Sequence, residues 1–333
     1  LESTFIGVWI FGWQKLSKKA HAGVAWLIAI GSNLSAVWIL IANSWMQHPV
    51  GYTIRNGRAE LTDFFAVITQ KFAMLQIIHV LSSAILLAGF LIMGISAYHL
   101  LKKQHIDFFS RSFRIGLVCG LVGSLVVAVE GDFHAKDVTE KQPVKLAAME
   151  SLWDTTRQAP IYLLAVPDEE NGRNAVELLP IPGVLSFLGH GDFNAEVKGL
   201  NDFPRDERPP VLPVFLAFRG MVALGAYFIL ITLYVMLRRN KLLESPLLLK
   251  AMLFSIPLPY LAIQLGWIVT ELGRQPWIVW GMMRTSDAAS PIAASQVIMT
   301  LIGFTLVYSL LGFAGYYLIY KHAKQGPATA QAA

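Results

Sequence analysis

Long apolar stretches constrain this chain more than any other feature. Six runs of about 15 to 30 residues carry almost no charge, and a shorter run begins the chain. A helix needs about 20 apolar residues to cross a bilayer. The runs cover residues 1–13, 20–43, 72–101, 115–129, 214–237, 249–272 and 293–320. The sequence therefore predicts an all-α fold, a polytopic bundle of transmembrane helices whose first helix is truncated.

Composition supports a membrane protein. Of the 333 residues, 55% are hydrophobic and 15% are charged, whereas soluble domains have about 25% charged residues. The single cysteine, Cys119, excludes a disulfide framework, a zinc finger and a covalent CxxCH heme attachment. Phosphoryl- and acyl-transfer enzymes lose support because the sequence has no P-loop, HExxH motif or nucleophile elbow. The net charge of +5 fits a bias in membrane loops better than nucleic-acid binding.

Residues 131–213 differ from the rest of the chain. They hold 14 of the 22 acidic residues and many of the prolines. Such a long hydrophilic segment is usually functional when it is ordered. We expect four regions along the chain: helices in 1–130, a long extracytoplasmic loop in 131–213, helices in 214–324 and a cytoplasmic tail in 325–333.

Positive charge is distributed unevenly between the two sets of short loops. The loops after the first, third, fifth and seventh runs carry 13 Lys and Arg residues, and the short loops on the other side carry 5. Cytoplasmic loops carry the excess in membrane proteins. The first set is therefore predicted to be cytoplasmic. The segments 131–213 and Gly273–Trp277 then share the outer face.

His79 and Met221 lie at matching depths in two predicted spans. Each is about seven residues from the outer end of its span, which corresponds to about 10 Å. A heme bound axially between two helices requires equal depths, and imidazole with thioether is a known ligand pair. The alternatives are a core histidine bonded to a carbonyl for His79 and ordinary apolar packing for Met221.

Two charged residues, Arg219 and Glu271, lie near outer span ends, where such residues are functional candidates. A buried arginine needs an anionic partner, either a heme propionate or an ion pair with Glu130 or Asp132. Glu271 can ligate iron, accept a proton or remain solvated. The nearby Arg274 and Trp277 are compatible with holding the edge of an anionic cofactor, although tryptophan is also a common membrane anchor.

Other candidates concern proton transfer. Glu2 and Ser35 are predicted near mid-membrane, where they can relay protons, and His21 lies at the cytoplasmic start of the next span. The alternative for Glu2 is a protonated carboxyl bonded to a neighbouring helix. In the outer segment, Lys145 and Glu150 are five residues apart, which differs from the i,i+4 spacing of a surface helix pair. Their alternative is a solvated face.

These residues stand within stretches that together resemble subunit I of the cytochrome bd family of quinol oxidases. The resemblance covers nearly the whole chain. The segments that carry it are Leu1–Gly7, Gly31–Ala36, Asn43–Gln47, Lys145–Glu150, Ala217–Met221, Ile256–Pro259 and Gly273–Trp277. It implies a terminal oxidase of a bacterial cytoplasmic (inner) membrane that oxidises ubiquinol or a related quinol at the outer side. Oxygen is reduced to water, and a proton gradient forms without pumping.

The resemblance also implies cofactors and residue roles. The cofactors are a low-spin heme b, a high-spin heme b and a heme d. His79 and Met221 would ligate the low-spin heme, with Arg219 as its electrostatic partner. The further implied roles are a high-spin heme ligand (Glu271), the quinol-binding loop (Lys145 and Glu150) and a cytoplasmic proton path (Glu2, Ser35 and His21).

The implied partners are a subunit II, a small single-span subunit, the lipid bilayer, quinol and oxygen. The 131–213 segment resembles the short-loop branch of the family. The family's first helices, with a heme-ligating histidine, are expected upstream of Leu1. Two other readings stay open from the residues alone: a membrane electron-transfer subunit with one heme, and a secondary transporter that uses Glu2, Arg219 and Glu271 as substrate or ion sites.

Overall fold

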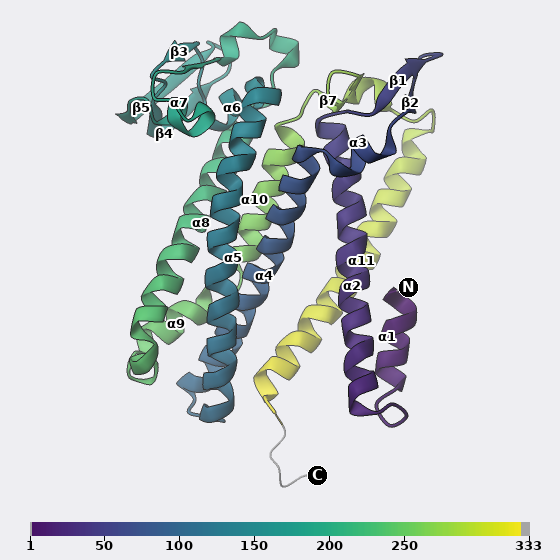
Figure 1. Ribbon diagram of the computed structural model, residues 1–333, viewed down its shortest axis with the longest axis vertical. Helices are drawn as coiled ribbons and strands as arrows, with labels where there is room; N and C mark the ends of the chain where they lie inside the picture. Colours follow the sequence, from purple (N-terminus) through teal and green to yellow (C-terminus); the bar gives the residue numbers. More distant parts are fainter. Residues whose placement is uncertain (1, 328–333) are drawn as a thin grey trace. The chain divides into compact units, whose positions relative to one another are not determined.

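Membrane-length helices dominate the structure, a computed structural model that describes residues 2–327 except the side chain of Glu2. A short helix, α1 (Glu2–Phe11), comes first. Six helical segments are long and apolar enough to cross a membrane. They are α2 (Lys18–Gln47), α4 (Lys71–Leu101), α5 (Ile106–Lys141), α8 (Val211–Arg238), α9 with α10 (Pro246–Phe254 and Leu258–Leu272) and α11 (Ala294–Gln325) (Figure 1). The predicted all-α, polytopic fold is confirmed.

Short strands form four two-stranded antiparallel sheets in the described residues. The pairs are β1 (Tyr52–Arg55) with β2 (Arg58–Leu61), β3 (Thr156–Arg157) with β6 (Glu196–Val197), β4 (Ile161–Asp168) with β5 (Arg173–Ile181), and β7 (Trp277–Val279) with β8 (Met283–Arg284). In the longest pair, Leu164 lies opposite Leu178. Asn56 and Gly57 close the first pair with φ values of 49° and 72°, as expected for the Asn-Gly turn of a tight hairpin.

The chain divides into two compact units. The first comprises residues 1–84, 126–220 and 265–284, and the second comprises residues 85–125, 221–264 and 285–333. The first unit contains the short helices α3 (Phe64–Thr69), α6 (Pro143–Glu150) and α7 (Val184–His190). Its main core joins Phe72, Val144, Ala148, Trp153 and Val214 with other apolar side chains. This core buries α6 against neighbouring parts of the same unit.

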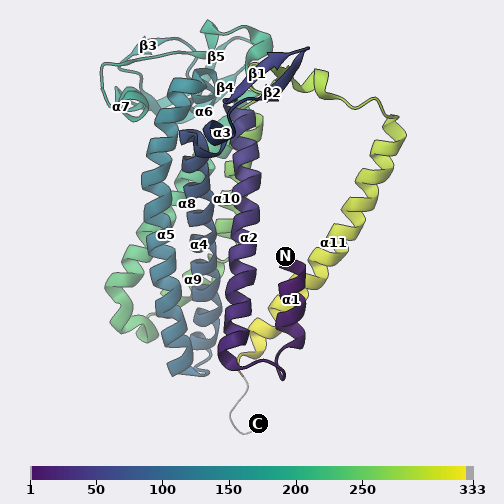
Figure 2. The same ribbon diagram turned by 45° about the vertical axis from the view of Figure 1, so that its right-hand side comes forward.

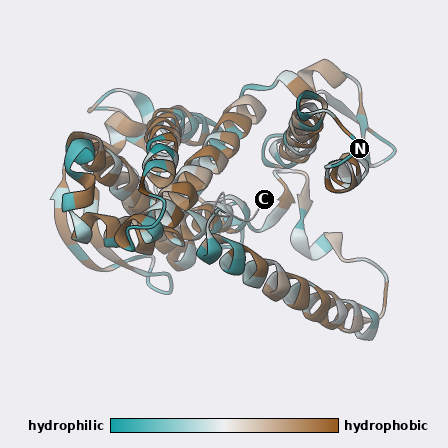
Figure 3. Ribbon diagram, turned by 90° about the horizontal axis from the view of Figure 1, so that it is seen from below, coloured by the Kyte–Doolittle hydropathy of each residue, from teal (hydrophilic) through white to brown (hydrophobic). Residues whose placement is uncertain are grey.

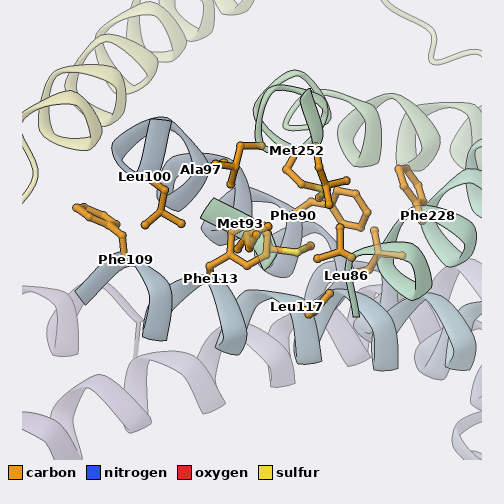
Figure 4. Close-up of a cluster of buried hydrophobic side chains, with 14 residues drawn as sticks. Leu86, Phe90, Met93, Ala97, Leu100, Phe109, Phe113, Leu117, Phe228 and Met252 are labelled. Carbon is orange, nitrogen blue, oxygen red and sulfur yellow. The ribbon is translucent and has the colours of Figure 1, made fainter. Parts of the chain in front are cut away.

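The second unit has its own apolar core. Phe90, Met93, Phe113, Phe228 and Met252 are among its largest fully buried side chains (Figure 4). The continuous helix α11 belongs to this unit (Figure 2). The C-terminal turn of α11 is hydrogen-bonded to His99, because the carbonyl oxygen of Ala323 lies 2.7 Å from His99 Nε2. Apolar residues predominate along the long helices (Figure 3).

Glycines permit a close helix contact within the second unit. A Cβ atom on Gly89 of α4 would lie 2.8 Å from the carbonyl oxygen of Gly116 and from Cα of Gly120, both on α5. Cβ atoms do not approach backbone so closely, so Gly89 requires glycine, and so does Gly116, where a Cβ atom would lie 2.8 Å from the Gly89 carbonyl oxygen. Small residues serve this purpose in many membrane helix pairs.

Two helices extend further than predicted. The Ser17 hydroxyl accepts a hydrogen bond from the Ala20 amide at 3.3 Å and starts α2 at Lys18. The α5 helix continues beyond Val129, the end of its predicted span, because Lys136 pairs with Asp132 and Lys141 pairs with Asp137 at i,i+4 spacing. Apolar length alone did not reveal this polar extension, which reaches into the segment predicted as a loop.

The predicted sixth span, 249–272, is two helices rather than one. The α9 helix ends at Phe254 and α10 begins at Leu258. Pro257 and Pro259 lack the amide hydrogens that a continuous helix would need there. Ser255 stabilises the break between the two helices. Its hydroxyl contacts the Tyr227 hydroxyl at 2.6 Å and donates to the Ala251 carbonyl at 2.7 Å.

Candidate functional site

Helix α6 is the centre of the candidate site in the first unit. Pro143 occupies its first turn, where a missing amide hydrogen is tolerated. Ser151 ends it with a left-handed φ of 52°. Every residue from Val144 to Glu150 is buried. The solvated face considered for Lys145 and Glu150 is therefore wrong, and both charges lie inside the protein.

Lys145 has only neutral oxygens as close partners in the described part of the chain. Lys145 is 3% exposed. Its Nζ atom donates hydrogen bonds to Gln47 Oε1 and to the Thr270 carbonyl, each at 3.3 Å. Burial, with a further contribution from the nearby Arg274, lowers the pKa of Lys145 to about 7. Lys145 can therefore hold or release a proton near neutral pH.

Glu150 forms an ion pair with Arg219. The Arg219 Nη2 atom lies 2.6 Å from Glu150 Oε2, and its guanidinium lies 5.3 Å from the centre of the Phe215 ring. Burial raises the pKa of Glu150 to about 7, although the positive charge of Arg219 acts in the opposite direction. The ion pair considered for Arg219 with Glu130 or Asp132 is wrong, because Glu150 takes that place.

Side-chain amides connect α6 to α2 and α10. Gln142 Nε2 donates to the Gln47 carbonyl at 2.8 Å, and Gln47 Nε2 donates to the Thr270 carbonyl at 3.1 Å. Sequence reasoning did not select Gln47 or Gln142 as site residues. Gln47 stands in the segment Asn43–Gln47 that resembles the family, but neither glutamine carries a charge that would have marked it as a candidate.

Glu271 lies at the end of α10 and is bonded on both carboxylate oxygens. Asn43 Nδ2 donates to Oε1 at 2.8 Å, and Arg274 forms a short ion pair with Oε2. Asn43 in turn accepts a hydrogen bond from Gln76 at 2.9 Å. The Glu271 side chain is 40% exposed and Arg274 is 4% exposed. The predicted neighbours Glu271 and Arg274 are thus brought together, with Glu271 partly open.

Trp277 lies in β7 and contacts other groups. The guanidinium of Arg284 lies 5.2 Å from the centre of its ring, and the rings of Trp277 and Trp280 are 6.5 Å apart. The amide of Trp280 donates to the Met46 carbonyl at 2.9 Å, which ties this hairpin to α2. The backbone amide of Trp277 donates to the Arg274 carbonyl at 3.1 Å.

His79 of α4 is held by a carboxylate from α5. Its Nδ1 atom forms a short hydrogen bond with Glu130, so the alternative of a histidine bonded to a carbonyl is wrong. Nε2 has no hydrogen-bond partner in the described residues, and 28% of the side chain is exposed. An imidazole fixed through one nitrogen and open at the other fits an iron ligand.

Buried guanidinium nitrogens without acceptors provide a second test of fit. In the described residues, Nε of Arg219 and both Nε and Nη1 of Arg274 lack a hydrogen-bond partner. Buried donors normally have partners. These nitrogens fit an anionic group such as a carboxylate, and together with His79 they are compatible with an iron cofactor that carries negative side groups.

The remaining predicted residues lie elsewhere. Met221 is half-buried on α8 and belongs to the second unit, so its pairing with His79 stays a prediction. Ser35 is exposed on α2. The His21 ring lies 2.8 Å from the Trp9 carbonyl and stacks on the Trp9 ring. The side chain of Glu2 is outside the described residues.

Comparisons with known proteins agree with these features. The model of the family "Cytochrome bd terminal oxidase subunit I" matches residues 1–327. The chain is 40% identical to cytochrome bd ubiquinol oxidase subunit 1 of Bacillus subtilis over 98% of this chain and 72% of that protein. It is 33% identical to cytochrome bd-II ubiquinol oxidase subunit 1 of Escherichia coli over 99% and 78%. The bd oxidase structure from Geobacillus thermodenitrificans is similar with a TM-score of 0.86, at 30% identity over 98% of this chain and 75% of that one.

Proposed function

The chain belongs to the cytochrome bd terminal oxidase subunit I family, and from that premise we propose that the buried charges around α6 carry out its reaction with quinol. As a member it is a quinol:oxygen oxidoreductase, a multi-pass membrane protein that uses hemes and works with a subunit II. The single-heme carrier and the secondary transporter are set aside. The observation that carries the proposal is the burial of Lys145 and Glu150 with pKa values of about 7.

We assign separate roles to the two groups. The Glu150 carboxylate accepts a proton from a quinol hydroxyl, since its pKa of about 7 suits both capture and release at neutral pH. Lys145 donates a hydrogen bond to a quinol oxygen. Arg219 keeps the Glu150 carboxylate oriented through the ion pair at 2.6 Å. The substrate is ubiquinol or a related quinol.

For the hemes, we propose a low-spin heme b, a high-spin heme b and a heme d. His79 and Met221 would hold the low-spin heme, and Arg219 would face one of its carboxylates through the free Nε donor. Glu271 would ligate a high-spin heme, with Arg274 and Trp277 at its edge. When bound, the hemes supply one-electron transfer and the reduction of oxygen to water.

Three further assignments complete the proposal. The 131–213 segment lies on the periplasmic side, where Glu150 releases its proton. Glu2 and Ser35, with His21, deliver protons from the cytoplasm. Charge then separates across the membrane without pumping. A small single-span subunit is a third component of the complex.

Replacing Glu150 tests the proposed role in quinol oxidation. We expect Glu150→Gln to lower quinol oxidase activity of the purified complex by about 10²-fold or more, because the proton acceptor is lost. The absorption spectrum of the hemes should remain, since Glu150 is not a proposed iron ligand. Steady-state oxygen consumption with a soluble quinol measures the effect.

The matched control is Glu140→Gln, which changes an exposed glutamate at the end of α5. It should keep the activity of the unaltered protein. Equal activities of the two variants would remove Glu150 from the mechanism.

A further inference from the structure

Glu130 is a buried carboxylate that the proposed reaction does not use. It lies on α5 and is 4% exposed. A charge in such a position is costly unless it is hydrogen-bonded. No Lys or Arg forms an ion pair with Glu130 in the described residues, and its close partners are two histidine rings. The contact of the Glu130 carboxylate with two histidine rings therefore needs an explanation other than neutralisation of its charge by Lys or Arg.

The two rings lie on opposite oxygens of the carboxylate. Nδ1 of His79 is bonded to Oε2, and Nδ1 of His134, one helical turn further along α5, lies 3.5 Å from Oε1. The ring centres of His79 and His134 are 6.3 Å apart and the planes are nearly perpendicular. His134 is itself held against Phe72, with ring centres 4.9 Å apart. The arrangement is a chain of three side chains that ends at His79.

The contact with Glu130 has a direct effect on the His79 ring. A carboxylate acceptor at Nδ1 places the ring hydrogen there and leaves the lone pair on Nε2. It also fixes the ring plane and makes the imidazole a stronger electron donor. The α5 helix lies beside the ring, since a Cβ atom on Gly131 would be in ordinary van der Waals contact with His79 Cε1, at 3.8 Å. His79 thus presents one nitrogen in one orientation.

We propose that Glu130, restrained by His134, positions His79 and lowers the reduction potential of the heme iron that His79 holds. The inference rests on the proposed ligand role of His79. A negative charge and a more basic imidazole next to the iron both favour the ferric state over the ferrous state. Glu130 and His134 are positioning residues, since neither would touch the iron.

A redox titration of the low-spin heme in the purified oxidase complex tests the inference. Glu130→Gln keeps an acceptor oxygen and removes the charge. We expect the one-electron equilibrium to shift toward the ferrous form by on the order of tenfold, about 59 mV in midpoint potential. Glu140→Gln, an exposed glutamate on the same helix, is the control and should leave the potential unchanged.

A second variant predicts the opposite sign. His134→Phe keeps a ring against Phe72 but frees Glu130 to interact with His79 alone, so the potential should fall. If Glu130→Gln does not yield an assembled protein, the midpoint potential of the His134→Phe protein alone tests the inference. Potentials equal to that of the unaltered protein would overturn the inference. Failure of the ligand role is separate, because a His79→Ala protein that keeps its low-spin heme spectrum would contradict the proposed function instead.

Discussion

At the residue scale, the buried ionisable groups of the site each have a different kind of partner. Lys145 is bonded to neutral oxygens and Glu150 to Arg219, whereas Glu130 is hydrogen-bonded to His79 and lies 3.5 Å from His134 Nδ1. Burial lowers the pKa of Lys145 and raises the pKa of Glu150, each to about 7. Both groups therefore change protonation near neutral pH. With the roles proposed for Lys145 and Glu150, we expect proton exchange with quinol to be sensitive to pH in the physiological range.

The pH dependence of kcat/KM for quinol follows from these two groups. Glu150 must be deprotonated to accept a proton, so the rate should rise as pH increases through about 7. Lys145 must be protonated to donate, so the rate should fall as pH increases through about 7. We expect a narrow bell-shaped profile centred near neutral pH.

The profile is measured by quinol oxidation in buffers of constant ionic strength. The residual activity of Glu150→Gln should lose the rising limb and keep the falling limb. A flat profile from about pH 6 to about pH 8 would contradict both assignments.

The candidate site residues could be selected from the sequence, but the contacts between them could not. Charge within apolar surroundings singled out Arg219 and Glu271, and the resemblance of segment Lys145–Glu150 to the family suggested the residues proposed to bind quinol. The partner of Arg219 is 69 positions away in the chain, and only the folded backbone brings the two together. Gln47 also lies in a family-like segment, Asn43–Gln47, but it was not selected because a neutral amide in an apolar run carries no charge.

At the element scale, the positions and the ends of the helices depend on different sequence features, and these features are not equally easy to recognise. Apolar length located all six membrane-length segments, since that pattern is continuous. It missed the polar end of α5 and the break between α9 and α10, which depend on i,i+4 ion pairs and on two prolines. The strand pairs were also missed, because strands of two to four residues have no detectable period, and the longer β4 and β5 do not alternate apolar with polar residues.

The glycine contact between α4 and α5 makes a prediction about stability. Gly89→Ala would place a Cβ atom against the backbone of Gly116 and Gly120. We expect the free energy of unfolding to fall by about 1–3 kcal/mol, as for other overpacked positions. Thermal unfolding of the purified protein in detergent measures the change.

Gly225→Ala is the matched control, because no atom lies within 4 Å of the Cβ position at Gly225 in α8. Its unfolding temperature should stay the same or rise, since alanine favours a helix over glycine. Equal destabilisation by both substitutions would show that the loss of glycine itself, and not the helix contact, is responsible.

At the scale of the whole molecule, the distribution of Lys and Arg predicts which ends of the helices face the cytoplasm. The 13 positive residues on one side against 5 in the short loops of the other side favour an outer position for segment 131–213. The proposed quinol chemistry at Glu150 then takes place on that side, and its protons are released there.

Cysteine labelling tests this orientation. In a Cys119→Ser background, which removes the single cysteine of these 333 residues, Lys198→Cys should react with a membrane-impermeant maleimide in right-side-out vesicles. Lys241→Cys should react only in inverted vesicles. Both positions are exposed, so folding does not hide them. The opposite pattern would reverse the assignment of the two faces.

The small hairpin of β1 and β2 has a practical consequence. Its Asn56–Gly57 turn has no atom within 4 Å of the Cβ position of Gly57, and every residue of β2 is exposed. Exposed hairpin tips tolerate inserted sequence well. The turn is therefore a suitable point for an affinity or fluorescent tag. A tag placed there would leave α6 and the Glu130–His79 contact intact and would let the intact complex be captured from the side predicted to be external.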